Sequence, residues 1–357
     1  MVRMIKFRRK VGGDDMNKKN CLLLLQWLIK CAFSGIIALT VLSVCAYIYN
    51  YTGIHITNQS KATDYTWQEN QRMHNMKEGF SFIKMDENGF NNPSVPESID
   101  ILLMGSSHME AYQVAQNENC AYLLNEYLSD YTTYNIGISG HTLYRIADNV
   151  EFALKEFNPS AFLLIETNTI QLDVEKMKEV INGESESLKS HDSGILFYLQ
   201  KIPAFKPIYN QLDIWFGLNS SNKRVNTVDN GETSKETVIP ESYTETLKEF
   251  LDQISEAAFA QGVQPIIFYS PNEILLPDGS ILYETNQEYF DIFKEACNSS
   301  GIIFIDMTEP FATMYKTDNV LAHGFSNTAV GRGHLNKYGH KEVAKTLVSI
   351  ILEEEKK

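Results

Sequence analysis

The pattern of apolar positions begins with one long run near the start of the chain. Residues 31–49 carry no charged side chain, and the apolar residues before Lys30 extend the run back to residue 21. As a helix, residues 31–49 would span about 28 Å, close to the hydrocarbon thickness of a bilayer. We therefore expect residues 21–49 to form a transmembrane anchor. A signal peptide cleaved near Val44–Ala46 is the alternative that the pattern leaves open.

Basic residues before this run predict its orientation. Residues 1–20 hold seven Lys and Arg against two Asp. Flanks of this composition stay in the cytoplasm, so we expect residues 1–20 to be a cytoplasmic tail and the chain after about residue 50 to lie outside the cell membrane. Met16 opens a second complete basic-then-apolar segment, so either Met1 or Met16 can be the start.

Beyond about residue 76, short apolar runs alternate with segments whose apolar residues recur at helical spacing. The pattern predicts strands at 99–104, 133–138, 161–165, 263–269 and 302–305, and helices at 121–128, 142–156, 244–261, 287–298 and 336–352. Strands that alternate with helices of this length form a parallel sheet that is covered by helices on both faces. The sequence therefore predicts an α/β domain over residues 76–357.

Two polar segments fall outside this alternation. Residues 50–75 are polar and mixed, which predicts a stalk between the anchor and the domain. Residues 170–241 place acidic and Ser/Asn-rich tracts around an apolar-aromatic stretch. Long segments of this kind in a compact domain are functional or disordered, so we expect an insertion that acts as a lid or a docking surface.

Charge and spacing exclude several classes of function. The net charge is −14 although the first twenty residues are basic, so the body is strongly acidic and is not expected to bind nucleic acid. No set of His, Cys and carboxylate residues has the spacing of metal ligands. The chain also has neither a phosphate-binding P-loop nor a dinucleotide fingerprint. We therefore expect neither a metal nor a cofactor.

Three polar segments lie at the boundaries of predicted elements. Ser107 follows the strand at 99–104, Gly140 follows the strand at 133–138, and His334 precedes the last helix. The carboxyl ends of parallel strands form the edge where ligands bind in such sheets. A serine and a histidine at that edge pair as nucleophile and base, and the N–H of a glycine beside them stabilises an oxyanion.

Together these segments resemble the SGNH (GDSL-like) hydrolase superfamily. Gly105-Ser106-Ser107 is similar to its first block, Gly140 to its second, and "HLNKYGH" from His334 to its last. The resemblance implies a flavodoxin-like three-layer α/β/α sandwich. It also implies an acyl-ester mechanism with Ser107 as nucleophile and His334 as base. The oxyanion donors would be the N–H groups of Gly140 and Ser107 and the side chain of Asn168.

The resemblance also implies a substrate. Members with one N-terminal anchor and an outer body resemble proteins that add or remove acetyl groups on cell-envelope polysaccharides. The expected activity is thus that of an esterase or an O-acetyltransferase, and the sequence does not choose between the two. For a transferase, a multispanning membrane protein that exports acyl groups is the expected partner.

The chain departs from the family pattern at two points. Gly331 stands three residues before His334, where the family usually has Asp, so a backbone carbonyl, Asp306 or Asp318 would have to orient the imidazole. The third block offers Asn168 within "LLIETNTI", which is not the family's local pattern. These departures keep a second function open, namely a non-catalytic glycan-binding or scaffold subunit of a polysaccharide assembly complex.

Two further histidines are candidates for substrate contact. His108 follows the candidate nucleophile, and the alternative for it is a solvated loop side chain. His323 lies in a loop rich in Gly, Asn and Ser, eleven residues before His334. We expect both to line the site.

Overall fold

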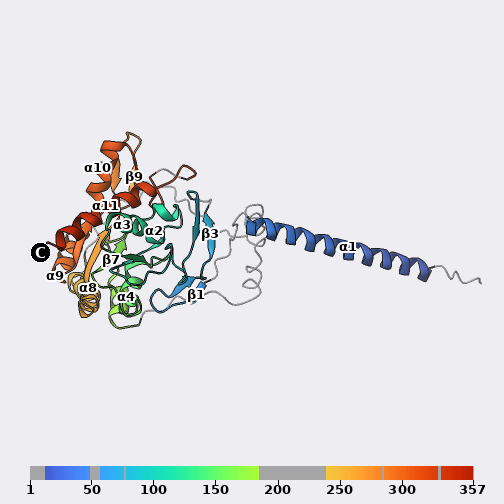
Figure 1. The fold of residues 1–357 in the computed structure, drawn as a ribbon, viewed down its shortest axis with the longest axis horizontal. Helices are drawn as coiled ribbons and strands as arrows, with labels where there is room; N and C mark the ends of the chain where they lie inside the picture. Colours follow the sequence, from blue (N-terminus) through green and yellow to red (C-terminus); the bar gives the residue numbers. More distant parts are fainter. Residues whose placement is uncertain are drawn as a thin grey trace, which may run out of the picture.

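The computed structural model describes residues 13–48, 57–75, 78–184, 239–283, 285–328 and 331–356. Its centre is a five-stranded parallel sheet with the order β11-β8-β7-β5-β6 (Figure 1). The strands are β5 (Ile101–Met104), β6 (Thr133–Asn135), β7 (Phe162–Thr167), β8 (Gln264–Tyr269) and β11 (Ile303–Asp306). Counted along the chain, this order is 2-1-3-4-5, the flavodoxin-like arrangement. The predicted α/β class is confirmed.

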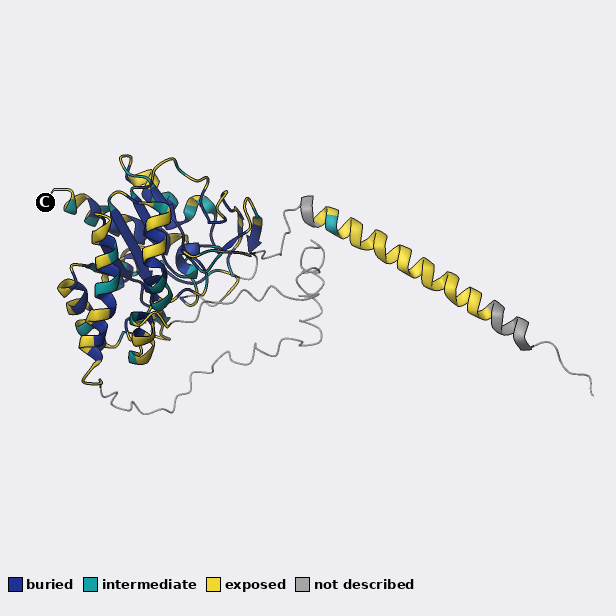
Figure 2. Cartoon of the chain, turned by 90° about the horizontal axis from the view of Figure 1, so that it is seen from below, coloured by how far each residue is buried: buried dark blue, intermediate teal, exposed yellow. Residues whose placement is uncertain are grey.

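Helices cover both faces of the sheet. One face packs against α4 (Leu143–Phe157), α8 (Tyr243–Ala260) and α9 (Gln287–Ser299), and the other against α3 (Cys120–Tyr127), α10 (Thr308–Asp318) and α11 (Lys337–Glu354). Successive side chains of a strand point to opposite faces, so Leu102 joins the first cluster and Leu103 the second. A strand covered on both faces is apolar throughout, which is why these runs are continuous in the sequence (Figure 2).

The segment predicted as a stalk is part of the folded body from residue 57 onward. It forms the antiparallel pair β1 (Thr57–Gln59) and β2 (Tyr65–Trp67), and then β3 (Arg72–Asn75), which pairs with β4 (Ser81–Lys84). Ala62, Trp67 and Met73 are buried in the same hydrophobic cluster as the sheet. The predicted boundary at residue 76 is therefore wrong, because widely spaced apolar residues on short hairpins give no periodic signal.

Short elements complete the body. They are α2 (Ser107–Glu110), the 3₁₀ turn η1 (Gln116–Glu118), α5 (Val174–Ile181), and a hairpin of β9 (Glu273–Leu275) with β10 (Ile281–Tyr283). Met177 and Val180 of α5 are buried in the same cluster as α8, so the start of the predicted insertion belongs to the body. Residues 185–238 of that insertion lie outside the described residues.

The N-terminal apolar run forms α1 (Gly13–Ile48). Its segment Asn20–Cys45 is long and apolar enough to cross a membrane, and no residue of its most apolar window is buried against the protein (Figure 2). The helix is thus a candidate transmembrane segment, as the uncharged run predicted.

Candidate active site

Ser107 is placed by the end of β5. The strand ends at Met104, Gly105 and Ser106 turn the chain, and Ser107 is the first residue of α2. Ser106 caps this short helix by accepting a hydrogen bond from the N–H of His108 at 3.3 Å. Gly105 is required by close packing, because a Cβ there would lie 2.5 Å from Cγ of Met109. Ser107 therefore lies at the carboxyl edge of the sheet.

A chain of three side chains runs from this serine. The hydroxyl of Ser107 lies 2.8 Å from Nε2 of His334, and Nδ1 of His334 lies 2.6 Å from Oε2 of Glu78. The backbone N–H of His334 donates to the other oxygen of Glu78 at 2.8 Å. The side chains of His334 and Glu78 are 28% and 22% exposed, so this row of three side chains is partly in contact with solvent. The structure thus brings together the predicted nucleophile and base, and adds a carboxylate.

Glu78 reaches His334 across 256 residues of sequence because two loops are joined there. Asn327 clamps the neighbouring Gly79: its Oδ1 accepts from the Gly79 N–H at 2.8 Å, and its Nδ2 donates to the Gly79 carbonyl at 3.1 Å. Gly333 leaves room for the carboxylate, since a Cβ at this position would lie 2.2 Å from Oε1 of Glu78.

The predicted partners of His334 are corrected by this geometry. Asp306 accepts hydrogen bonds from the backbone N–H and hydroxyl of Thr308 at 2.9 and 2.6 Å, so its carboxylate is engaged at the start of α10. Asp318 is the last residue of α10, whereas both ring nitrogens of His334 face other side chains, those of Glu78 and Ser107. Gly331 has a φ of +75°, a conformation that an aspartate would adopt only with strain. Glu78, and neither aspartate, is the carboxylate beside Nδ1 of His334.

The loop that leads to His334 is held by a second glutamate, Glu273. Oε2 of Glu273 accepts the backbone N–H groups of Ala322 and His323 at 3.0 Å each, and lies 3.0 Å from Nδ1 of His323. The His323 side chain is only 1% exposed. The prediction that His323 lines the site is therefore wrong. It lies behind the site, with its ring 5.5 Å from that of His108.

Asn336 fixes the other end of that loop. Its Nδ2 donates to the carbonyl oxygens of Leu321 and Gly324 at 2.8 and 3.1 Å. Its Oδ1 accepts from the N–H groups of Tyr338 and Gly339, which caps α11. The asparagine of the "HLN" motif therefore ties the loop before His334 to the helix after it.

A fully buried carboxylate supports the nucleophile turn. Glu166 of β7 accepts from the N–H and the hydroxyl of Ser106 at 3.0 and 2.7 Å, and lies 3.4 Å from Nδ1 of His108. Burial favours the neutral acid, but the His108 imidazole and the Ser106 donors outweigh it and hold the pKa of Glu166 below its usual value. His108 is buried here, so it is not a solvated loop side chain.

The candidate oxyanion residues follow the two strands beside β5, in the loops after β6 and β7. The N–H of Ile138 donates to the carbonyl of Gly105 at 3.1 Å, so the loop after β6 runs along the nucleophile turn. Gly140 of this loop is exposed and has a φ of +86°. Asn168 follows the end of β7 and is exposed. Both residues lie at the same sheet edge as Ser107, and their role as donors stays a prediction.

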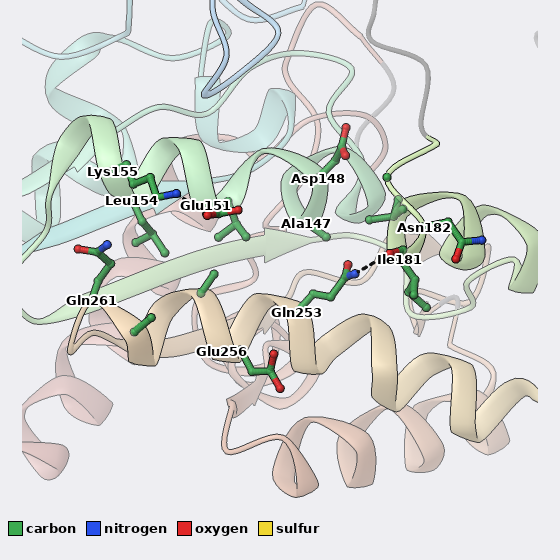
Figure 3. Close-up of a pocket in the computed structure, with 15 residues that line it drawn as sticks. Ala147, Asp148, Glu151, Leu154, Lys155, Ile181, Asn182, Gln253, Glu256 and Gln261 are labelled. Carbon is green, nitrogen blue, oxygen red and sulfur yellow. Dashed lines mark hydrogen bonds and ion pairs between the residues drawn. The ribbon is translucent and has the colours of Figure 1, made fainter.

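A separate hollow of about 540 Å³ lies between α4, α5 and α8 (Figure 3). Its walls come from Ala147 to Lys155 of α4, from the end of α5 and from the second half of α8, with Glu151, Lys155 and Glu256 among the lining residues. The helices that cover a parallel sheet run antiparallel to its strands. The C-terminal parts of α4 and α8 therefore lie toward the amino edge of the sheet, opposite the edge that carries Ser107. The hollow contains none of the candidate site residues. Within the described ranges, no group of His, Cys, Asp and Glu is arranged to hold a metal ion.

No protein-family model and no curated protein matches the sequence. Many solved structures that resemble the fold are SGNH or GDSL hydrolases. A psychrotrophic esterase, EstA from Pseudoalteromonas sp., is 13% identical with a TM-score of 0.38, and covers 72% of this chain and 98% of its own.

Two further structures give similar values. The acetyl xylan esterase AlAXEase is 14% identical with a TM-score of 0.39, covering 71% of this chain and 99% of its own. A member of the lipolytic G-D-S-L family from Veillonella parvula is 13% identical with a TM-score of 0.36, covering 71% and 98%. Likenesses of this size concern the fold alone, so the roles of the site residues rest on the contacts described above.

Proposed function

We propose that this protein is a serine-dependent acyl-ester hydrolase or O-acetyltransferase that acts on a cell-envelope polysaccharide outside the cytoplasm. The observation that carries the proposal is the chain of contacts from the Ser107 hydroxyl through His334 to Glu78. Nucleophile, base and orienting carboxylate lie within hydrogen-bonding distance in the order that nucleophilic acyl transfer requires.

The chemistry follows from these contacts. Oγ of Ser107 attacks the carbonyl carbon of the ester while its proton passes to Nε2 of His334. The C–O bond to the leaving alcohol then breaks, and His334 returns the proton to that oxygen. Water or a sugar hydroxyl attacks the acyl-serine, its proton passes through His334, and the acyl group leaves Ser107. The N–H groups of Gly140 and Ser107 and the side chain of Asn168 would hold the developing oxyanion.

Glu78 is the residue that makes His334 a competent base. A carboxylate beside Nδ1 keeps the proton on that nitrogen, leaves Nε2 free to accept, and stabilises the imidazolium that forms. Burial raises the pKa of Glu78, but the hydrogen bonds from the His334 ring and backbone outweigh this and lower it from the usual 4.5. The carboxylate is therefore ionised wherever the base works.

The polysaccharide substrate rests on the sequence motifs and on the apolar N-terminal helix. That helix would hold the catalytic body at the outer face of the cell membrane, beside the envelope glycans, with residues 1–20 in the cytoplasm. His108, predicted to contact substrate, is 5% exposed and lies 3.4 Å from Glu166, so we assign it to support of the turn that carries Ser107 instead. If the acceptor is a sugar hydroxyl, a multispanning membrane protein that exports acyl groups would supply the donor.

Hydrolysis of a chromogenic acetyl ester by the full chain in detergent micelles tests this function. We expect turnover to fall at least about 10³-fold in Ser107→Ala and in His334→Ala. Ser129→Ala, an exposed serine far from the site in sequence, should leave it unchanged. Adding acetyl-acceptor oligosaccharides separates the two activities, since a transferase forms acetylated sugar in place of acetate. Equal turnover in all variants would remove Ser107 and His334 from the mechanism.

The non-catalytic alternative predicts the opposite pattern. A glycan-binding or scaffold subunit would retain its binding of acetylated and deacetylated polysaccharide in Ser107→Ala and would never release acetate. The glycine at position 331 motivated this alternative, because it leaves no local acid for His334. The carboxylate of Glu78 at 2.6 Å from Nδ1 supports the enzyme instead.

A further inference from the structure

A second buried glutamate links the nucleophile helix to the loop after β6. Glu110 is the last residue of α2, three residues after Ser107, and is 2% exposed. Its carboxylate accepts hydrogen bonds from the indole N–H of Trp67 and from the hydroxyl of Ser139. Each carboxylate oxygen therefore has its own donor, one from β2 and one from the loop.

The loop end of this link is the residue before Gly140. The carbonyl of Ser139 accepts from the hydroxyl of Tyr65 at 2.7 Å, so both its side chain and its backbone are held. The loop also packs directly on α2, since a Cβ at Gly137 would lie 2.7 Å from the backbone nitrogen of Glu110. Gly140 itself is exposed, and a Cβ added there would meet nothing within 4 Å. The loop is therefore held on both sides of Gly140, by Ser139 before it and by the buried His141 after it, whose N–H donates to the carbonyl of Ile138 at 3.2 Å.

We propose that Glu110 is a positioning residue that sets the distance between Oγ of Ser107 and the N–H of Gly140. This inference rests on the proposed function. An oxyanion donor acts only within about 2.7–3.1 Å of the oxygen, so small shifts of the loop are costly. A carboxylate that belongs to the nucleophile helix and holds the neighbour of the donor fixes that separation through two hydrogen bonds.

The burial of a charge at this place supports a role beyond packing. A carboxylate removed from water costs free energy that hydrogen bonds only partly restore, and an apolar residue would fill the same space without that cost. Burial raises the pKa of Glu110, and the bonds from Ser139 and Trp67 offset it only in part. Trp67 and Tyr65 both come from β2, so the N-terminal hairpins hold the oxyanion loop as well as supplying Glu78.

The kinetics of covalent labelling test this proposal. A fluorophosphonate reacts with an activated serine and needs the oxyanion site, whatever the natural acyl acceptor is. With the full chain in detergent, we expect Ser139→Ala to lower the maximal labelling rate about tenfold. The concentration for half-maximal rate and the pH profile should stay unchanged, because His334 and Glu78 are untouched. Ser139→Thr keeps the hydroxyl and should restore most of the rate.

Ser160→Ala is the matched control. Its hydroxyl also donates to a carboxylate, Asp100, at 2.6 Å, but it lies before β7 at the opposite edge of the sheet. It should label at the wild-type rate. Trp67→Phe removes the other donor to Glu110 and should slow labelling in the same way, which keeps the test decisive if Ser139→Ala unfolds.

The outcomes separate this inference from the proposed function. Wild-type rates in both Ser139→Ala and Trp67→Phe, with labelling abolished in Ser107→Ala, would overturn the role of Glu110 and leave the serine mechanism standing. A parallel rise in the half-maximal concentration would also overturn it, since that result indicates a change in binding of the probe. No labelling of the wild-type chain would overturn both.

Discussion

The two halves of the candidate site are built in different ways. The nucleophile half is local: β5, the turn at Gly105 and α2 place Ser107, and Glu166 of the adjacent strand holds the turn. The acid half joins two loops that are far apart in sequence, those of Glu78 and His334. The sheet therefore fixes where the candidate nucleophile lies, while the pairing of His334 with Glu78 depends on a few long-range contacts.

The largest effect on activity is expected from a change of Glu78, the carboxylate that faces His334. Glu78→Gln keeps the size of the side chain but removes the charge and lets Nδ1 of His334 lose its proton. We expect kcat for an acetyl ester to fall about 10³–10⁴-fold. Glu97→Gln, at an exposed position outside the site, is the matched control and should behave as wild type. A fall of less than about threefold in Glu78→Gln would mean that another group orients His334.

A second change alters the space that Glu78 occupies. Gly333 and Gly262 have φ values of +90° and +72°, so alanine strains the backbone at both. Only at Gly333 would the new Cβ meet Glu78, at 2.2 Å from Oε1, whereas nothing lies within 4 Å at Gly262. We expect both variants to lose about 1 kcal/mol of stability. Only Gly333→Ala should also lose activity, by about 10–100-fold.

Thermal unfolding and ester hydrolysis measured on both variants separate strain from displacement of the acid. Equal activity in Gly333→Ala and Gly262→Ala would show that the carboxylate of Glu78 does not need its present place.

A smaller effect comes from the clamp between the two loops. Asn327→Ala removes both hydrogen bonds to Gly79 and frees the backbone next to Glu78. We expect kcat to fall about tenfold, because the acid then samples positions away from His334. Asn298→Ala, at the exposed end of α9, should leave kcat unchanged. If the two asparagine variants have the same kcat, the loops are held together by other contacts.

The smallest expected effects are on stability and compare two buried glutamates. Folding lowers the pKa of Glu166, so its ionised form adds stability above pH 4.5 that is lost as the pH falls through the lower, folded value. Folding raises the pKa of Glu110, so its stabilising effect is present at acid pH and lost as the pH rises through the folded value. Glu166→Gln should thus lower the melting temperature at pH 7, and Glu110→Gln should raise it.

Melting curves from pH 3 to pH 8 check the sign of both shifts. The difference from wild type should shrink toward acid pH in each case. A lower melting temperature for Glu110→Gln at pH 7 would mean that its hydrogen bonds outweigh the cost of burying the charge.

This contrast explains what the sequence could predict. The fold could be predicted because continuous apolar runs are typical of buried parallel strands. The place of Ser107 could be predicted because a glycine followed by two serines indicates the end of such a strand. The place of His334 could be predicted because it directly precedes a segment with helical spacing of apolar residues. The sequence also marks Glu166, because it is an acidic residue inside the apolar run "FLLIET".

Glu78 and Glu110 left no such signal. Glu78 lies in the loop of the short β3–β4 hairpin, whose apolar residues are too sparse to show a period, and its partner is 256 residues away. Glu110 lies among mixed residues just after the nucleophile, and its burial arises only when Trp67 and Ser139 converge on it. Contacts between distant loops depend on the finished fold, so local patterns do not contain them.

The central claim is that Ser107, and not the adjacent Ser106, is the activated nucleophile. Ser106 donates its hydroxyl to Glu166, whereas the hydroxyl of Ser107 lies beside Nε2 of His334. The most direct test is peptide mass spectrometry of the full chain after reaction with a fluorophosphonate. We predict that the phosphonyl group is found on Ser107 in the wild type and is absent in His334→Ala. A label on Ser106, or equal labelling of wild type and His334→Ala, would contradict the account.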